Sequence, residues 1–352
     1  MEKKDILLLA IAALVTLVTG FAVNSGINSV VLFLMTAVAL VLVAMIVGKA
    51  TEQLGSRMGP AATGVLQSAL GNLPELFVCI FALKAGLDTV VKAALIGSIL
   101  GNSVLVFGLA LLFGGLKNGT QYFRSEPPKM IATLMLLAFA AMAIPSLTNY
   151  LHTAAESHIN ALDIMVSIVL LVVFFASLIF SIKGDEALVP QEETQEHHAN
   201  WSLAVTLIIL AISGLAAAFV SDWFVKALEP AMETLGINQV FAGLIVVAIA
   251  GNAIENLVGI QLAIKNKADY SVSVIMNSSL QIALVLYPIL VLVSFFIGGA
   301  VLSFVLSPLL LASFALAVIV SAFIVFDGES IWLEGVALIG LYIIIATAFW
   351  WG

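Results

Sequence analysis

Continuous apolar runs constrain this chain more than any other feature of its sequence. Runs of about 18 or more apolar residues recur along its whole length, and each could cross a ~30 Å hydrocarbon core as a helix. The runs are continuous rather than alternating, which excludes a membrane-spanning β-barrel. The mean hydropathy of +1.18 and a charged fraction of only 10% agree, because soluble domains carry far more charge. We therefore predict an all-α polytopic membrane protein.

We expect about 11 transmembrane helices, joined mostly by short loops. The predicted spans are residues 6–23, 28–48, 60–83, 89–114, 130–148, 162–182, 203–221, 238–264, 271–296, 300–325 and 332–350. If the N-terminus is cytoplasmic, ten of the 13 Lys and Arg residues fall on the cytoplasmic side. This bias predicts a multi-pass protein of the cell membrane with its C-terminus outside. No small-residue cleavage site ends the first run, so we expect a retained helix rather than a removed signal peptide.

The sequence also matches itself at an offset of 180 residues. Gly71-Asn72 falls on Gly251-Asn252, Glu75 on Glu255, Ser98 on Ser278 and Leu100 on Leu280, with no gap. Spans 2–6 and 7–11 then form two five-helix repeats, and because five is odd the second repeat is inverted. The predicted organisation is an N-terminal helix (1–27), a first repeat (28–182), an acidic cytoplasmic linker (183–200) and a second repeat (201–352).

The repeated motifs place two carboxylates, Glu75 and Glu255, deep in apolar runs, where an acid is costly and marks a functional site. The expected ligand residues share the oxygen chemistry of amides, hydroxyls and carboxylates, and they are Glu75, Glu255, Asn72, Asn252, Ser98, Asn102, Ser278 and Gln281. Such oxygen ligands suit a hard cation such as Ca²⁺ better than zinc or copper. Pro74 lacks an N–H, so we expect the Leu70 carbonyl to lose its helical donor and become free to bind a cation.

Two carboxylates match one divalent ion in charge. Without the ion they cannot both stay charged in a low-dielectric site, so protons bind instead. Protons and a divalent cation therefore compete for the same oxygens, which predicts an exchanger. No nucleotide-binding loop occurs, so ion gradients must supply the energy, and we expect no cofactor and no enzymatic activity.

At these residues the chain is similar to calcium/proton exchangers of the cation/Ca²⁺ exchanger superfamily, in the bacterial branch of the cation/proton exchangers. The matching segments are GNLPEL (71–76), GSILGN (97–102), FAGLIVVAIAGNAIEN (241–256) and NSSLQIAL (277–284). The resemblance implies an eleven-helix calcium/proton antiporter that exports Ca²⁺ by alternating access, with Glu75 and Glu255 as its central acids. Three positions depart from the pattern: Asn256 stands where relatives often carry His, Asn277 where Gly usually precedes the Ser, and Pro74 resembles the sodium-coupled branch.

Several alternatives stay open at this point. Exchange coupled to sodium or potassium needs the same ligands, a passive cation channel is an alternative of another class, and an intramembrane enzyme is more distant. The net charge of −8 argues against nucleic acid as a partner, and the sequence leaves a homo-oligomer in the bilayer open. The linker is either a solvated tether or a cation-sensing segment. Acids at span ends are expected at the interface: Asp88, Asp163, Asp222, Glu229, Glu233, Asp327, Glu329 and Glu334.

Overall fold

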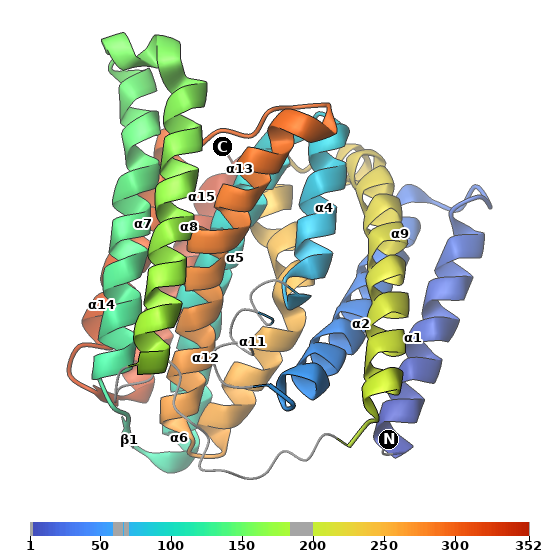
Figure 1. The fold of residues 1–352 in the computed structure, drawn as a ribbon, viewed down its shortest axis with the longest axis horizontal. Coiled ribbons are helices and arrows are strands. Elements are labelled where there is room, and N and C mark those ends of the chain that lie inside the picture. The colour runs from blue at the N-terminus through green and yellow to red at the C-terminus, as the bar shows by residue number, and fades with distance from the viewer. Residues whose placement is uncertain (1–2, 59–65, 67–69, 184–199, 352) are drawn as a thin grey trace.

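A computed structural model describes residues 3–58, 66, 70–183 and 200–351, without the side chains of 181–183 and 253–256. The described chain is a bundle of helices that run roughly from one end of the molecule to the other (Figure 1). Its first part contains α1 (Lys3–Ala22), α2 (Ser29–Gly55), α4 (Leu73–Lys84), α5 (Asp88–Leu100), η1 (Gly101–Val106), α6 (Phe107–Asn118), β1 (Gln121–Tyr122), α7 (Glu126–Tyr150), η2 (Ala154–His158) and α8 (Ile159–Lys183).

The second part has a similar order of elements. It contains α9 (Leu203–Leu235), α10 (Gln239–Phe241), η3 (Ala242–Val247), α11 (Ala248–Ile264), α12 (Ala268–Gln281), η4 (Ile282–Leu286), α13 (Tyr287–Ile297), α14 (Pro308–Ile324), β2 (Glu329–Ser330) and α15 (Trp332–Trp351). The segments η1, η3 and η4 are π-helical, and η2 is a 3₁₀ helix. The one departure from an all-α chain among the described residues is β1, which pairs antiparallel with β2.

Local sequence signals explain where several helices begin. The Asn28 side chain accepts hydrogen bonds from Val30 N and Val31 N at the start of α2, and Ser202 accepts one from Val205 N at the start of α9. Gly236 ends α9 with a φ of +68°, a conformation that glycine adopts without strain. The predicted span 203–221 was therefore too short, because the helix continues to Leu235 and Pro230 inside it does not end it.

Eight helices in the described part of the chain are long and apolar enough to cross a membrane. A ninth span follows if the pair Gln239–Asn252 and Leu257–Ile264, bent by 63°, is counted as one. The predicted spans 60–83 and 300–325 correspond to the shorter helices α4 and α14, and residues 59–65 and 67–69 of the former lie outside the described part. The count of 11 spans and the inverted repeat stay predictions.

The prediction that a helix starts at residue 300 was wrong, because residues 300–307 run as a non-helical segment. Gly298 and Gly299 turn the chain with positive φ angles, and α14 begins only at Pro308, where Ser307 caps it. Four backbone N–H groups of this segment are bonded to other elements instead. These hydrogen bonds are Ala300 N to Leu83 O, Leu302 N to Ser294 Oγ, Phe304 N to Asp163 Oδ1, and Leu306 N to Ser146 Oγ.

Asp163 shows how this segment is held. It lies near the start of α8, as a span-end acid should, but it is fully buried rather than exposed. Its Oδ1 accepts the Phe304 N–H at 3.3 Å, and the Tyr287 hydroxyl donates to Ser303 O at 3.0 Å. The segment is thus fastened across the ends of α4, α7, α8 and α13.

At the opposite end of the molecule, a buried polar cluster joins α1, α2 and the residues that precede α9. The Asp5 carboxylate, 3% exposed, pairs with the Lys49 ammonium and accepts the Trp201 indole N–H at 2.9 Å. Trp201 N donates to Gln53 Oε1, and the Arg57 guanidinium donates to Trp201 O. The helices α1, α2 and α9 lie side by side at the right of Figure 1.

We predict that Asp5→Ala lowers the free energy of unfolding by about 2 kcal/mol, because it leaves a partly buried ammonium and a buried indole N–H without their acceptor. Unfolding in detergent, followed by the melting temperature, checks this. Asp222→Ala is the control, since it removes an exposed pair with Lys226 on one helix and should cost less than about 0.5 kcal/mol. Equal losses in the two variants would contradict the structural role of the Asp5 cluster.

Candidate functional site

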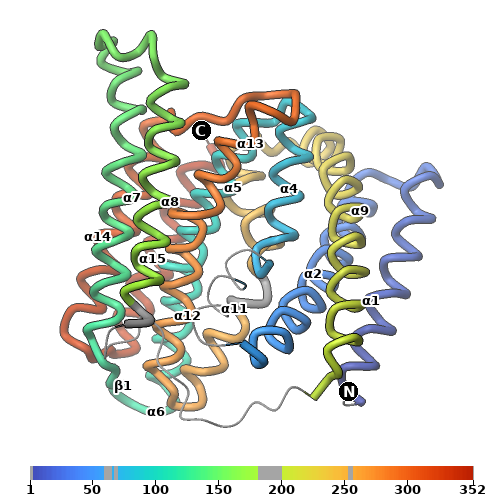
Figure 2. Tube along the Cα trace, in the orientation of Figure 1, coloured from blue at the N-terminus to red at the C-terminus, as the bar shows by residue number. Residues whose placement is uncertain are grey.

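Glu75 lies in the first turn of α4, which begins halfway along the height of the molecule (Figure 2). The expectation of a proline inside a continuous helix was wrong here. Asn72 occupies the N-cap position without a side-chain hydrogen bond to the helix, and Pro74 occupies the first turn, where no N–H is needed and the fixed φ favours helix. Glu75 is 3% exposed. The positive end of the α4 dipole favours a carboxylate at this position.

A chain of hydrogen bonds connects Glu75 to α5 and α11. The Ser98 hydroxyl donates to Glu75 Oε1 at 2.5 Å, and the Asn252 amide donates to Ser98 Oγ at 2.8 Å and to Ala248 O at 3.0 Å. Ser98 and Asn252 are 1% and 3% exposed. The Asn252 Oδ1 atom is buried and accepts no hydrogen bond from any described atom. An acceptor in this state costs free energy until a partner reaches it.

Two further hydrogen bonds bring the remaining described residues of the predicted ligand set together in pairs. Asn102 Nδ2 donates to Ser278 Oγ at 2.9 Å, and Asn72 Nδ2 approaches Gln281 Oε1 at 3.5 Å. All four side chains are buried. Each pair joins one residue from before the linker to one from after it, as does the Glu75–Ser98–Asn252 chain. Seven of the eight predicted residues are therefore placed in bonded groups that cross between the two parts of the chain.

Glu255, the eighth residue, belongs to α11, three positions after Asn252, and its side chain lies outside the described part. Gly251 faces the other carboxylate, because a Cβ built on it would lie 3.6 Å from Glu75 Cγ. The segment with Asn252 is thus in direct contact with Glu75. The acidic linker, residues 183–200, also lies mostly outside the described residues, so its role stays a prediction.

Two features around the site were missed from the sequence. The first is the π-helical turns η1 and η4, which directly follow the segments with Ser98 and with Ser278, and η1 itself contains Asn102. Single π turns are frequent at functional sites, because they widen the helix and change which side chains share a face. No propensity in these apolar sequences signals a π turn.

The second feature is a close crossing of α5 and η3. A Cβ on Gly97 would lie 2.1 Å from the Leu244 carbonyl oxygen, and one on Gly243 would lie 2.4 Å from the Val90 carbonyl oxygen. Only glycine at both positions lets the backbones come this close. Gly97 precedes Ser98 directly, so the crossing sets the distance between Ser98 and α11. Gly97 stands beside Ser98 in the sequence, but nothing there shows which backbone it meets.

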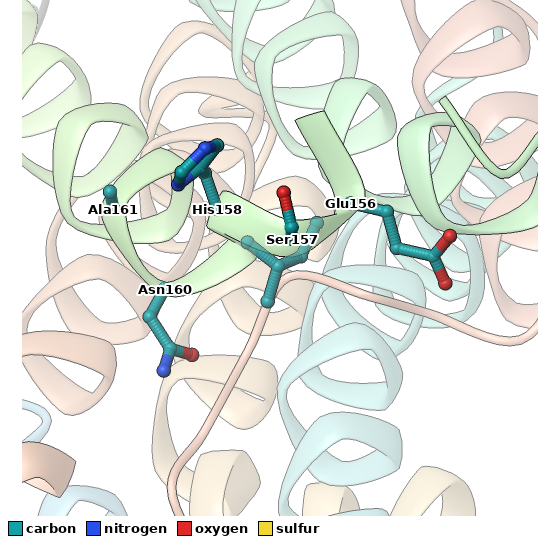
Figure 3. Close-up of a pocket in the computed structure, with 6 residues that line it drawn as sticks. Glu156, Ser157, His158, Asn160 and Ala161 are labelled. Carbon is teal, nitrogen blue, oxygen red and sulfur yellow. The ribbon is translucent and has the colours of Figure 1, made fainter. Parts of the chain in front are cut away.

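Other polar groups of the described chain do not form a second site. An open hollow at the tip of α7 and α8 is lined by residues 156–161, and the side chains of Glu156 and His158 lie apart from each other there (Figure 3). Across the described residues, no three His, Cys, Asp or Glu side chains gather as a metal cluster would require. Cys79 is buried, as expected for a small apolar residue. The oxygen-rich groups around Glu75 are the candidate site.

The chain is similar in sequence to known membrane exchangers over most of its length. The family model described as "Sodium/calcium exchanger protein" matches residues 28–183 and 205–351. The chain is 36% identical to a Ca²⁺/H⁺ antiporter of Synechocystis and 35% identical to the Ca²⁺/H⁺ antiporter ChaA of Bacillus subtilis. These matches cover 92% and 91% of this chain and 92% of each relative.

Solved structures agree with this match. The chain superposes on native YfkE with a TM-score of 0.82 and 31% identity, over 99% of this chain and all of that one. The H⁺/Ca²⁺ exchanger CAX superposes with a TM-score of 0.77 at 17% identity, over 99% of this chain and 92% of that one. At that identity the likeness to CAX concerns the fold alone.

We predict that Gly97→Ala costs about 2 kcal/mol of folding free energy, because the new methyl group meets the Leu244 backbone and pushes α5 away from η3. A larger distance between α5 and η3 would also lengthen the hydrogen bond from the Asn252 amide to Ser98 Oγ. Melting in detergent and the transport rate in vesicles check both effects. Gly101→Ala, one turn later on the same helical run, is the matched control, since no atom lies within 4 Å of its Cβ position. Equal losses of stability and of transport rate in the two variants would contradict the close crossing of α5 and η3.

Proposed function

Because this chain belongs to the sodium/calcium exchanger protein family, we propose that it is a calcium/proton antiporter that exports Ca²⁺ from the cytoplasm. The two antiporters compared above are named for this exchange and match the chain over nine-tenths of its length. The long apolar helices of the chain place the transporter in a membrane.

The observation that supports the proposal most directly is the buried Asn252 oxygen beside Ser98 and Glu75. A polar atom that is buried without a partner costs about 1–3 kcal/mol, so the site gains stability when a cation supplies the missing contact. Carboxylate, amide and hydroxyl oxygens are the ligands that Ca²⁺ prefers. Glu75, Asn252, Ser98, Asn72, Asn102, Ser278 and Gln281 would contribute to this site, together with Glu255.

Coupling follows from the charges of Glu75 and Glu255. A Ca²⁺ ion neutralises two carboxylates, and two protons do the same when the ion leaves. An empty site with two charges would be costly to carry through a low-dielectric protein. The protein therefore changes its access only when it holds Ca²⁺ or protons. Ser98 can bond to Glu75 in either protonation state of that carboxylate, because its hydroxyl can either donate to a charged Glu75 or accept from a protonated one.

Alternating access is supported by the way helix contacts recur. The helix α2 packs on α11, and α9 packs on α4 in the corresponding way. In the same manner, α6 packs on α11 as α13 packs on α4. Likewise, α7 packs on α12 as α14 packs on α5. In Figure 1, α5 and α6 run downward whereas α12 and α13 run upward. These contacts are what two inverted five-helix repeats would make around one central site.

The labelled termini lie at opposite ends of the molecule in Figure 1, which favours the predicted odd number of crossings. With the N-terminus cytoplasmic, the Asp5 cluster marks the inner end, and the segment 300–307 marks the outer end. The acidic linker is then cytoplasmic.

We predict that Glu75→Gln and Glu255→Gln each abolish Ca²⁺ uptake driven by a pH gradient, because one carboxylate can no longer neutralise the ion or exchange its proton. Uptake of ⁴⁵Ca²⁺ into inside-out vesicles checks this, and it should collapse when an uncoupler is added. Glu156→Gln, at the exposed tip of α7 and α8, is the control and should transport at the wild-type rate. Robust transport by either the Glu75→Gln or the Glu255→Gln variant would overturn the two-carboxylate mechanism.

Sodium coupling is the second candidate, because the matching family model carries sodium in its description and Pro74 resembles that branch. We expect vesicles loaded with sodium or potassium, without a pH gradient, to take up less than about a tenth of the Ca²⁺ that a pH gradient drives, since carboxylates bind protons far more tightly than alkali ions. Equal Ca²⁺ uptake driven by sodium would show that sodium, rather than the proton, is the coupling ion. Flux that needs no counter-ion and does not saturate would indicate a channel.

A further inference from the structure

The Asp163 carboxyl is a buried acid that the calcium exchange proposed above does not use. Its side chain is fully buried near the start of α8, where residues 300–307 cross the ends of the helices. One oxygen, Oδ1, accepts the Phe304 N–H at 3.3 Å. The other oxygen, Oδ2, is also buried and is bonded to no described atom. Asp163 therefore has one oxygen with a partner and one without.

The cation that interacts electrostatically with Asp163 is Lys92 of α5, but this lysine pairs with another acid. Its Nζ atom lies 3.6 Å from Asp88 Oδ2, and 17% of its side chain is exposed. Asp163 takes part in no ion pair with another described residue. A buried carboxylate without a pair is costly, whereas a neutral carboxylic acid in the same place costs far less.

The surroundings of Asp163 Oδ2 suit a proton better than a metal ion. A cation such as Ca²⁺ needs about six oxygen ligands. The nearby backbone oxygens already accept hydroxyls, because Tyr287 donates to Ser303 O at 3.0 Å and Ser167 donates to the Asp163 carbonyl at 2.8 Å. Among the described residues no second acid joins Asp163 in a cluster that could hold a metal. A proton needs only the one free oxygen.

Phe304 connects Asp163 to the non-helical segment 300–307. Its N–H is bonded to Asp163, its carbonyl accepts the Ser146 hydroxyl at 2.9 Å, and its ring centre lies 4.8 Å from that of Tyr287. Phe304 is itself fully buried. Opening of the segment at Phe304 would therefore break the bond to Asp163 and expose the carboxyl to water, where its charged form is no longer costly.

We propose that Asp163 binds a proton at Oδ2, and that this proton stabilises residues 300–307 in their closed position over the helix ends. Binding forms an O–H bond at Oδ2 and turns the carboxylate into a neutral carboxylic acid. Oδ1 remains the carbonyl oxygen that accepts the Phe304 N–H. In the orientation proposed above, this end of the molecule faces the side from which protons enter. Proton binding at Asp163 requires neither that orientation nor calcium exchange.

Opening of residues 300–307 should then depend on pH. In the open segment Asp163 loses its proton above about pH 4, as an aspartic acid in water does. Low pH therefore favours the closed segment, and closure becomes less stable as the pH rises. Because one proton is exchanged, the opening equilibrium can rise at most about tenfold per pH unit. The other titratable groups of the described chain on the surrounding elements at this end are Cys79, Lys84, Asp88, Lys92, Tyr150, His152, Glu156, His158 and Tyr287.

Hydrogen–deuterium exchange at the Phe304 amide of the purified full-length protein tests this. Wild type is compared with Asp163→Asn between about pH 5 and pH 9. The asparagine is neutral at every pH and keeps an Oδ1 acceptor for the Phe304 N–H, so it also calibrates the intrinsic pH dependence of amide exchange. We expect the ratio of the wild-type rate to the variant rate to rise about tenfold or more over this range. The infrared carbonyl band of a carboxylic acid should be stronger in wild type than in the variant at the low end.

Glu156→Gln is the matched control, because it neutralises an acid on the same hairpin that is exposed and pairs with His152. We expect this variant to keep the wild-type pH dependence. A rate ratio that stays constant with pH overturns the proton on Asp163, as does an infrared spectrum that is the same in wild type and Asp163→Asn. If Asp163→Asn does not fold, wild-type protection of Phe304 that is constant after correction for intrinsic exchange overturns it. Absence of proton-driven Ca²⁺ uptake would overturn the proposed function instead and would leave these measurements unchanged.

Discussion

The hydrogen bonds from Asn252 to Ser98 and from Ser98 to Glu75 are the interaction on which the centre of this protein depends. They bring one carboxylate, one hydroxyl and one amide from three helices into a region with almost no exposure. In such surroundings an unpaired polar group costs several times what a paired one contributes. The helices around the site must therefore hold these atoms within bonding distance. The glycine crossing of α5 and η3 and the π turns do this by setting how close the backbones come.

The same requirement explains the two ends of the bundle. Residues 300–307 are not helical, and four of their N–H groups are paired with Asp163, Ser146, Ser294 and the Leu83 carbonyl. At the other end, Asp5 satisfies the Lys49 ammonium and the Trp201 indole together. Polar groups at both ends thus fasten helices that packing of apolar side chains alone would allow to slide, because apolar surfaces fit at many registers. The site lies between these two fastened ends.

Two kinds of polar group can therefore be distinguished in this chain. Those at the ends have partners that belong to the protein. Those at the centre include Asn252 Oδ1, a buried acceptor without a described partner, and a serine that both donates and accepts. Groups of the second kind are suited to a ligand that comes and goes.

The sequence by itself determined the class of fold and pointed to seven residues that the structure brings together in bonded groups. Long apolar runs require helices, since only helices or closed barrels pair every backbone group in a membrane. Acids and amides inside such runs stand out, because they are costly there, and this signal pointed to Glu75, Asn252 and their neighbours. Only the tertiary structure decided where α4 begins, that α14 starts at Pro308, that Asp163 is buried, and which backbone Gly97 meets. These features depend on contacts between residues far apart in the chain, and an apolar sequence carries no local signal for the partner that it will meet.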